Sequence, residues 1–176
     1  MHIRLATPAD APAINAIYVP NVLDGAASFE IVPPTEGEMA GRISHTLTER
    51  PWFVAEETGA IQGYAYAGRH RERPGYQWSV ETSVYVHPAH QKRGIARALY
   101  RELFQQLAKQ GYYNAFAVIT LPNEASIALH ESLGFVPVGT YRNAGFKLGK
   151  WWDVGWWQKN LRAHSVPEGA PRVLAG

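Results

Sequence analysis

The stretch VYVHPAHQKRGIARALY, residues 84–100, could bind an anion where a predicted strand gives way to a helix near Gly94. The first turn of such a helix presents unpaired N–H groups and the positive end of its dipole, which attract phosphate. Gly94 permits close approach of a ligand to the backbone. Nearby positive charge comes from Lys92, Arg93 and Arg97. An anion site and a plain solvated helix start both remain open from this stretch alone.

Glu81 is a second residue that could take part in a reaction, because it lies on the β-rich run YQWSVETSVYV that leads into this junction. A carboxylate beside a binding site can take a proton from a reacting group. The alternative, which position alone favours, is a half-exposed strand glutamate paired with an arginine. The loop before this run is basic, because Arg69, Arg71 and Arg73 form a cluster there.

Several other chemistries lack their motifs in this sequence. Neither GxxxxGK[ST] nor an N-terminal GxGxxG occurs, so a nucleotide hydrolase and a dinucleotide fold are unsupported. His87 and His90 lie three residues apart, but no third ligand follows at metal spacing and no HExxH exists, so we expect no metal site. The absence of cysteine excludes a disulfide framework, a thiolate metal site and a cysteine nucleophile.

Composition predicts one compact domain. The 176 residues are 46% hydrophobic, and 17 basic residues stand against 15 acidic ones, so charge gives no reason to expect a nucleic-acid partner. The N-terminus has no signal-peptide pattern, and no stretch approaches the roughly 20 apolar residues of a membrane span. We therefore expect a cytoplasmic protein with no membrane partner.

Periodicity and turn residues predict the elements that position these residues. Breaks are expected at Pro20 and Gly25, between the first two helices. The order is a strand, two helices, a three-stranded meander, a helix, a strand, a helix and further strands, which indicates a mixed α/β fold of the α+β type. We assign residues 1–163 to one domain and the proline- and glycine-rich residues 164–176 to a C-terminal tail. The predicted helices and strands are HIRLA (2–6), a helix capped by Thr7, a helix from Thr35 to Leu47, WFVAE (52–56), IQGYAYAG (61–68), 76–86, a helix from Ile95 ended by Gly111, AFAVIT (115–120), a helix capped by Asn123 and closed at Gly134, 135–142 and 150–161.

The pattern Gln91-x-x-Gly94-x-Ala96, preceded by VYV, resembles the coenzyme A pyrophosphate loop of the GNAT superfamily of N-acetyltransferases. Ala96 stands where many members have glycine, a variation that the family pattern admits. Within the superfamily, the chain resembles the phosphinothricin acetyltransferases over nearly its whole length. The stretches that carry this resemblance are SFE, RPWFVAE, GYAYAG, VETSVYV, LPNEAS, LHESLGF and GFKLGKWWDVGWWQ, in that order.

The resemblance implies a GNAT fold, with a central, mostly antiparallel sheet that splays at the acetyl-CoA site and carries helices on both faces. The exposed backbone of the splayed strand pairs with the pantetheine arm, and the backbone amides of the following loop hold the phosphates. Asn123 matches a position that touches acetyl-CoA, although a helix cap is the alternative role and one residue can serve both. The implied acetyl-CoA residues are Val84, Tyr85, Val86, Lys92, Arg93, Gly94, Ile95, Ala96, Arg97 and Asn123.

The resemblance also implies the chemistry. Glu81 matches the acid that the phosphinothricin enzymes use as general base, directly or through water, and this match favours the catalytic role over the paired glutamate. His130 stands where many superfamily members carry a tyrosine proposed to protonate the departing CoA thiolate, and it matches the histidine of the phosphinothricin enzymes. An imidazole there could relay protons, with local packing as its alternative role. Since no nucleophile motif is present, we expect direct transfer without an acetyl-enzyme.

The implied acceptor is a small amino acid with a second anionic group, such as phosphinothricin. Arg73 matches a family arginine that could grip that group, with a solvent-facing basic loop as the alternative. Tyr76 and Tyr85 match tyrosines near the acceptor, and Phe29 is a weaker candidate wall. Methionine sulfoximine or sulfone, another small amine and a protein N-terminus remain alternative acceptors, and a non-catalytic acyl-CoA-binding module is the alternative of another class.

The tryptophan-rich segment near the C-terminus predicts a strand covered on both sides. Trp152, Val154 and Trp156 fall on one face, and Trp151 and Trp157 fall on the other. Such a strand belongs inside a sheet or at a subunit contact. Because the resembled family tends to form dimers, we expect a homodimer with this segment close to the interface or the acceptor pocket.

Overall fold

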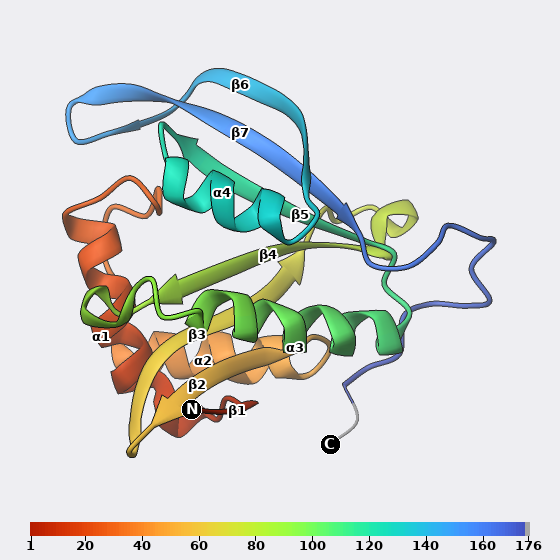
Figure 1. Cartoon of the computed structure of the whole chain (residues 1–176), viewed down its shortest axis with the longest axis horizontal. Helices are drawn as coiled ribbons and strands as arrows, with labels where there is room; N and C mark the ends of the chain where they lie inside the picture. The colour runs from red at the N-terminus through yellow and green to blue at the C-terminus, as the bar shows by residue number, and fades with distance from the viewer. Residues whose placement is uncertain (175–176) are drawn as a thin grey trace.

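The computed structural model describes residues 1–174, which form one seven-stranded sheet with helices on both faces (Figure 1). The strand order is β1-β2-β3-β4-β5-β7-β6, and only the β4–β5 pair is parallel. The fold class and the order of elements expected from the sequence are confirmed. The elements are β1 (His2–Leu5), η1 (Pro8–Asp10), α1 (Ala11–Leu23), α2 (Glu36–Leu47), β2 (Trp52–Glu57), β3 (Ala60–Arg69), η2 (Pro74–Tyr76), β4 (Ser79–Val86), η3 (Pro88–His90), α3 (Ile95–Gln110), β5 (Asn114–Leu121), α4 (Glu124–Ser132), β6 (Val136–Lys147) and β7 (Lys150–Asn160).

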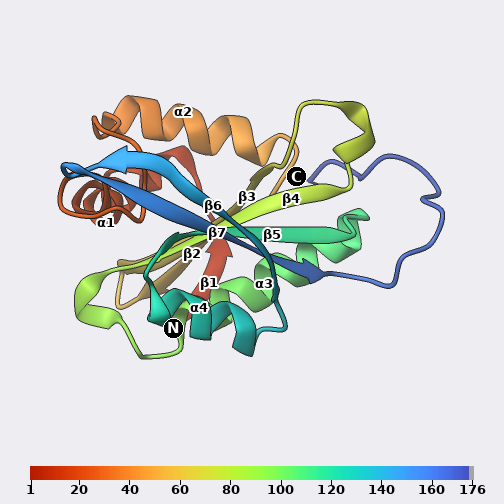
Figure 2. The same ribbon diagram turned by 90° about the horizontal axis from the view of Figure 1, so that it is seen from above.

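Alternation along β3 assigns its side chains to two cores. Ala65 and Ala67 belong to the core under α3, whereas Tyr64 belongs to the core formed with α1 and α2. Figure 2 shows these two helical layers on opposite sides of the strands. Because successive side chains of a strand point to opposite faces, each strand residue near the centre of the sheet is committed to one layer.

Helix α3 follows its predicted pattern. Its apolar stripe is buried, and it is formed by Ile95, Leu99, Leu103 and Leu107. Glycines in the left-handed region stand at both ends, with φ of 79° at Gly94 and 99° at Gly111. A residue with a Cβ is disfavoured there, so these two glycines fix where the helix begins and ends.

Some boundaries differ from the sequence expectation, and the largest difference is at β6, which continues to Lys147 rather than ending near Arg142. Helix α1 continues through Pro20 to Leu23, and the Asn21 side chain donates to the Ile17 carbonyl at 2.9 Å within this turn. Strand β4 begins at Ser79 rather than near Tyr76, because Pro74–Tyr76 form a 3-10 turn. Proline fixes its own φ and lacks an N–H, which suits the start of such a turn.

The tryptophan-rich segment forms β7, which lies between β5 and β6, so its predicted place inside the sheet is confirmed. Beyond Asn160 the described chain has no helix or strand, but it returns to α3. The Arg172 N–H donates to the Gln110 carbonyl at 2.8 Å, and the Gln110 amide donates to the Arg172 carbonyl at 2.9 Å. Residues 175–176 of the expected tail lie outside the described residues. None of the described helices has the length and apolar character needed to cross a membrane.

Candidate functional site

Strands β4 and β5 separate at the centre of the sheet. They pair only through Ser79–Glu81 and residues 114–116, and Glu81 opposite Phe116 is the last pair. From Thr82 to Val86, β4 keeps β3 on one side and has no strand partner on the other. A strand edge without a partner leaves N–H and C=O groups free to pair with something else.

A cavity of about 470 Å³ opens at this separation. Its walls come from the free half of β4, the loop before α3 and the start of α3, the second half of β5, and α4, with Asn21 and Ala27 at the end of α1 and just after it. The implied site residues that line it are Val84, Tyr85, Val86, Lys92, Gly94, Ile95, Ala96, Arg97, Asn123 and His130. Residues far apart in the sequence therefore meet in one hollow.

The start of α3 lies at this cavity and has the features that can attract an anion. The first bond of the helix runs from the Ala98 N–H to the Gly94 carbonyl at 3.0 Å, so the preceding N–H groups have no partner within the helix. The Arg97 guanidinium ties α3 to α4 through the Ser132 hydroxyl at 2.7 Å. Among the residues implied to bind acetyl-CoA, Arg93 is the one that does not line the cavity. Its side chain instead contacts Glu57 at 2.9 Å and His90 at 3.0 Å.

Asn123 lines the cavity and also caps α4. Its Oδ1 accepts from the Ser126 N–H at 3.1 Å, which satisfies one of the unpaired donors at the start of the helix. The two roles left open by the sequence are therefore compatible in one side chain.

Glu81 stands where the two strands part. Alternation along β4 places it on the opposite face from Val80, which packs under α3. Its Oε1 accepts hydrogen bonds from His70 Nδ1 at 3.0 Å and from Arg71 Nη1 at 3.2 Å. The Glu81 side chain is 31% exposed. Both contacts come from the segment just after β3, since Gly68 pairs with Glu81 in the β3–β4 register. The sequence analysis missed both residues in this role, and the hairpin register was the signal that could have found them.

His130 is buried and hydrogen bonded through both ring nitrogens. Nδ1 contacts the Ser126 carbonyl oxygen at 2.7 Å, and Nε2 contacts the Tyr100 hydroxyl at 3.1 Å. Because a carbonyl can only accept, Nδ1 carries the hydrogen and Nε2 accepts from Tyr100. Burial lowers the pKa of His130, which favours this neutral form.

The four implied acceptor residues do not all line one cavity, since Tyr85 lines the main cavity and Arg73 lines another. Tyr76 meets the His70 ring edge to face at 5.8 Å. Tyr85 packs against Tyr64 at 5.3 Å between ring centroids and also lines the main cavity. Phe29 lies against β6, where a Cβ added at Gly145 would fall 2.2 Å from its ring.

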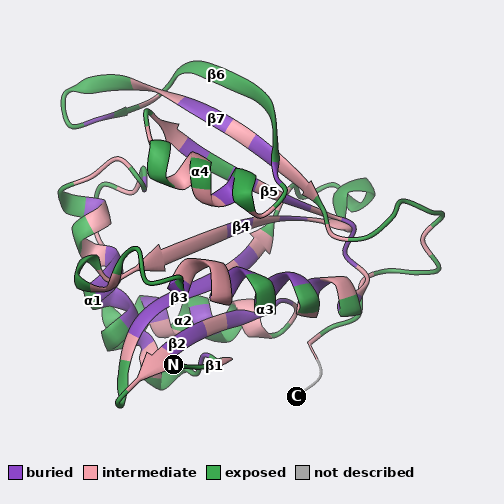
Figure 3. Cartoon of the chain, in the orientation of Figure 1, coloured by how far each residue is buried: buried purple, intermediate pink, exposed green. Residues whose placement is uncertain are grey.

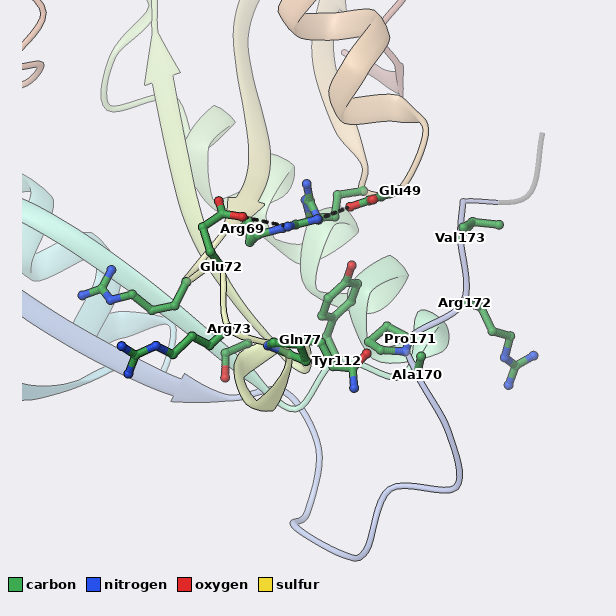
Figure 4. A pocket seen from close by; sticks show the side chains of 14 residues that line it. Glu49, Arg69, Glu72, Arg73, Gln77, Tyr112, Ala170, Pro171, Arg172 and Val173 are labelled. Carbon is green, nitrogen blue, oxygen red and sulfur yellow. Dashed lines mark hydrogen bonds and ion pairs between the residues drawn. The ribbon is translucent and has the colours of Figure 1, made fainter.

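Arg73 lines a different cavity of about 320 Å³, formed with Arg69, Arg71 and the C-terminal segment 170–173. In Figure 4 the Arg73 side chain points away from Glu49 and from Arg172, while Arg69 bonds to Glu49 and Glu72. Arg71, two residues earlier, is the arginine of this loop that contacts Glu81. Among the residues that the structure describes, no cluster of three or more histidines and carboxylates could hold a metal ion.

The family model described as an acetyltransferase (GNAT) domain matches residues 3–156. The chain belongs to the GNAT acetyltransferase family. The phosphinothricin N-acetyltransferase of Streptomyces viridochromogenes is 39% identical over 167 residues, which span 95% of this chain and 91% of that protein. The L-methionine sulfoximine/L-methionine sulfone acetyltransferase of Salmonella typhimurium is 38% identical, over 96% of this chain and 99% of that protein.

The solved structures agree with this assignment. A GNAT superfamily phosphinothricin acetyltransferase from Sinorhizobium meliloti, solved in complex with acetyl-CoA, has a TM-score of 0.90 and 40% identity, covering 96% of this chain and 94% of that one. This GNAT chain is therefore an acetyltransferase that uses acetyl-CoA as co-substrate. Its own residues fit that molecule, since a free strand edge suits an amide-bearing arm and a helix start suits a diphosphate.

Proposed function

We propose that this GNAT enzyme transfers the acetyl group of acetyl-CoA directly to the amine of a small amino-acid-like acceptor such as phosphinothricin. The observation that carries the proposal is the place of Glu81, the last residue of β4 that pairs with β5 before the free edge begins. A carboxylate there stands beside the point at which an acyl group bound along the open strand would end.

In this proposal, acetyl-CoA binds to the residues of the main cavity. The free edge of Val84, Tyr85 and Val86 pairs with the pantetheine arm, and the N–H groups from Lys92 to Arg97 hold the diphosphate. Arg93 contributes its backbone, because its side chain is engaged with Glu57. Asn123 contributes from the α4 cap.

Glu81 serves as the general base. An amino-acid amine is mostly protonated near neutral pH and can attack a thioester only after it has lost that proton. Oε1 of Glu81 is occupied by His70 and Arg71, so Oε2 is the oxygen that takes the proton, directly or through water. A backbone N–H of the open edge of β4 can donate to the thioester carbonyl as negative charge develops on its oxygen. The C–N bond forms as the C–S bond breaks, and CoA leaves as a thiolate or thiol. No acetyl-enzyme is needed, because the chain contains no cysteine and no recognisable nucleophile motif.

His130 was implied to return a proton to the CoA thiolate. Since Nδ1 donates to Ser126 and Nε2 accepts from Tyr100, either nitrogen would have to exchange its partner before it could give a proton to the cavity. These contacts favour the alternative role, in which His130 fixes the buried Tyr100 hydroxyl and the wall of the cavity.

The acceptor is proposed from the relatives and from positive charge near Glu81. Two relatives are named for the acetylation of phosphinothricin and of methionine sulfoximine. Both compounds are small amino acids with a second polar group. Arg71 reaches Glu81 itself, and Arg73 lies on the same loop, so either guanidinium could grip an anionic group. Phe29, Tyr76 and Tyr85 are the proposed aromatic walls.

Thiol release from acetyl-CoA tests the proposal with phosphinothricin, methionine sulfoximine, methionine sulfone and a panel of small amines. Glu81→Gln is the diagnostic variant, because the amide oxygen can still accept from His70 and Arg71 while the base is lost. We expect turnover to fall about a hundredfold or more, with unchanged acetyl-CoA affinity by calorimetry. Unchanged turnover would remove Glu81 from the mechanism. Tight acetyl-CoA binding with no thiol from any acceptor would instead indicate an acyl-CoA-binding module.

A homodimer is proposed from the edge strand β6. Figure 3 shows β6 exposed along most of its length, although it carries many apolar side chains. The exposed apolar residues of β6 and of the turn and strand that follow are Val136, Val138, Tyr141, Phe146, Leu148 and Trp151. A second copy would cover them, which light scattering at micromolar concentration tests directly.

We also propose that the enzyme acts in the cytoplasm. Two features support this placement, the use of acetyl-CoA as co-substrate and a sequence without cysteine, which needs no oxidising compartment. Fractionation of cells that express the tagged chain tests it.

A further inference from the structure

We propose that His70 is a positioning residue for catalysis, which fixes the Glu81 carboxylate so that Oε2 alone faces the acceptor amine. The inference rests on the proposed role of Glu81 as general base. His70 does not line the main cavity, and its polar contact is with the Glu81 carboxylate, so it acts through Glu81.

The His70 ring is held in one orientation by three aromatic side chains. It stacks on Phe116 with 4.3 Å between ring centroids and 11° between planes. Tyr76 and Trp156 meet it edge to face at 5.8 Å and 6.1 Å. Only 11% of the side chain is exposed. A ring packed on several sides loses its rotamer freedom when the protein folds, so its hydrogen bond costs little further ordering at the site.

Phe116 connects this ring to the strand separation. It is the β5 residue paired with Glu81, and that pair is the last one between β4 and β5. The surface on which His70 stacks and the carboxylate that it contacts therefore belong to one register position. Any shift of the ring relative to Glu81 would have to break either the stacking or the strand pair.

The two oxygens of the Glu81 carboxylate have different surroundings. His70 Nδ1 and Arg71 Nη1 both contact Oε1, at 3.0 Å and 3.2 Å. No side chain or backbone N–H of residues 1–174 donates to Oε2. The two partners are not equivalent, because Arg71 is 46% exposed and can exchange its contact for water, whereas His70 is enclosed. His70 is thus the residue that sets the direction of the free oxygen.

Two substitutions at His70 separate the hydrogen bond from the packing. His70→Phe keeps a flat ring for stacking on Phe116 and removes the donor. His70→Asn removes the ring and keeps an amide N–H near the position of Nδ1. His164→Phe is the matched control, since His164 also stacks on an aromatic ring, Tyr113 at 5.8 Å, and contacts a polar side chain, Asn114 at 3.0 Å.

The measurements are kcat and both KM values for the acceptor that gives thiol release, with folding checked by thermal unfolding. For His70→Phe we expect kcat to fall about ten- to a hundredfold, because a misplaced base loses most of its effect, while both KM values stay within about twofold. His70→Asn should recover a large part of that loss, and His164→Phe should equal the unmodified enzyme. Combined with Glu81→Gln, His70→Phe should cause no further loss.

The outcomes distinguish this inference from the proposed function. If Glu81→Gln is inactive but His70→Phe has the kcat of the unmodified enzyme, the positioning role of His70 is wrong, whereas the general-base role of Glu81 still holds. An additional loss from His70→Phe in the Glu81→Gln background would also overturn it, since His70 would then act independently of Glu81. If Glu81→Gln itself is fully active, the proposed function fails first.

Discussion

Gly63→Ala should disturb the enzyme at the point where β3 supports the open strand. Gly63 is paired with Val86, at the end of β4 that lines the main cavity, where we propose that acetyl-CoA binds. A Cβ at this position would lie 2.8 Å from the Tyr85 carbonyl oxygen and 3.3 Å from both the Val86 Cα and the Ile95 Cγ2. The nearest atom belongs to the backbone, so it cannot rotate away and β4 itself must move.

The magnitude follows from a comparison within the same strand. Overpacking against atoms that cannot yield costs about 1–3 kcal/mol. Gly68→Ala is the matched control, because its Cβ would meet nothing closer than the Glu81 carbonyl oxygen at 4.0 Å. Without a clash, glycine to alanine stabilises by about 0.4–1 kcal/mol through the unfolded chain. The two variants should therefore differ by about 2 kcal/mol, which is a separation of about 1 M in urea midpoint at an ordinary m-value.

Urea unfolding followed by tryptophan fluorescence measures the stability, and calorimetry measures acetyl-CoA binding. We expect Gly63→Ala to lower the midpoint and to weaken acetyl-CoA binding, because the displaced atoms belong to Tyr85 and Val86. Gly68→Ala should raise the midpoint slightly and keep the affinity. Equal midpoints and equal affinities for the two variants would refute the reasoning that close approach of β3 to β4 requires glycine.

Two further predictions concern Gly94 and His130. Gly94→Ala meets no atom within 4 Å but must hold φ near 79°, so it should lower the free energy of unfolding by about 1–2 kcal/mol and weaken acetyl-CoA binding. Gly75→Ala, which also meets no atom and has no positive φ, should lower neither the stability nor the affinity, and similar behaviour of the two variants in thermal unfolding and calorimetry would contradict the strain argument. Burial lowers the pKa of His130, so as pH falls below about 6.5 the unfolded chain takes up the proton first and the folded state loses stability. Unfolding at pH 5.5 and 7.5 should show a smaller pH dependence for His130→Asn than for the unmodified enzyme, and an unchanged dependence would rule out His130 as its source.

Much of the fold was predictable because its signals are local. The capping pair Thr35 and Glu38, the turn residues of the β2–β3 hairpin and the glycines at the two ends of α3 each act within a few residues. The loop around Gly94 is equally local, and it led to the GNAT resemblance and to the residues that now line one cavity. Where a local rule met tertiary packing it sometimes failed, as in α1, which runs through Pro20 because its buried face, with Ile17 and Val22, packs on the sheet.

The sequence by itself determined the order of elements, the caps, the place where α3 begins and the family. Only the tertiary structure decided that β4 leaves β5 after Glu81, that His70 and Arg71 converge on one oxygen of that carboxylate, and that Arg93 turns away to Glu57. The physical reason is the distance along the chain. A cap joins residues three or four apart, whereas these contacts join groups 10, 11 and 36 positions apart, whose meeting depends on strand register and packing rather than on neighbouring residues.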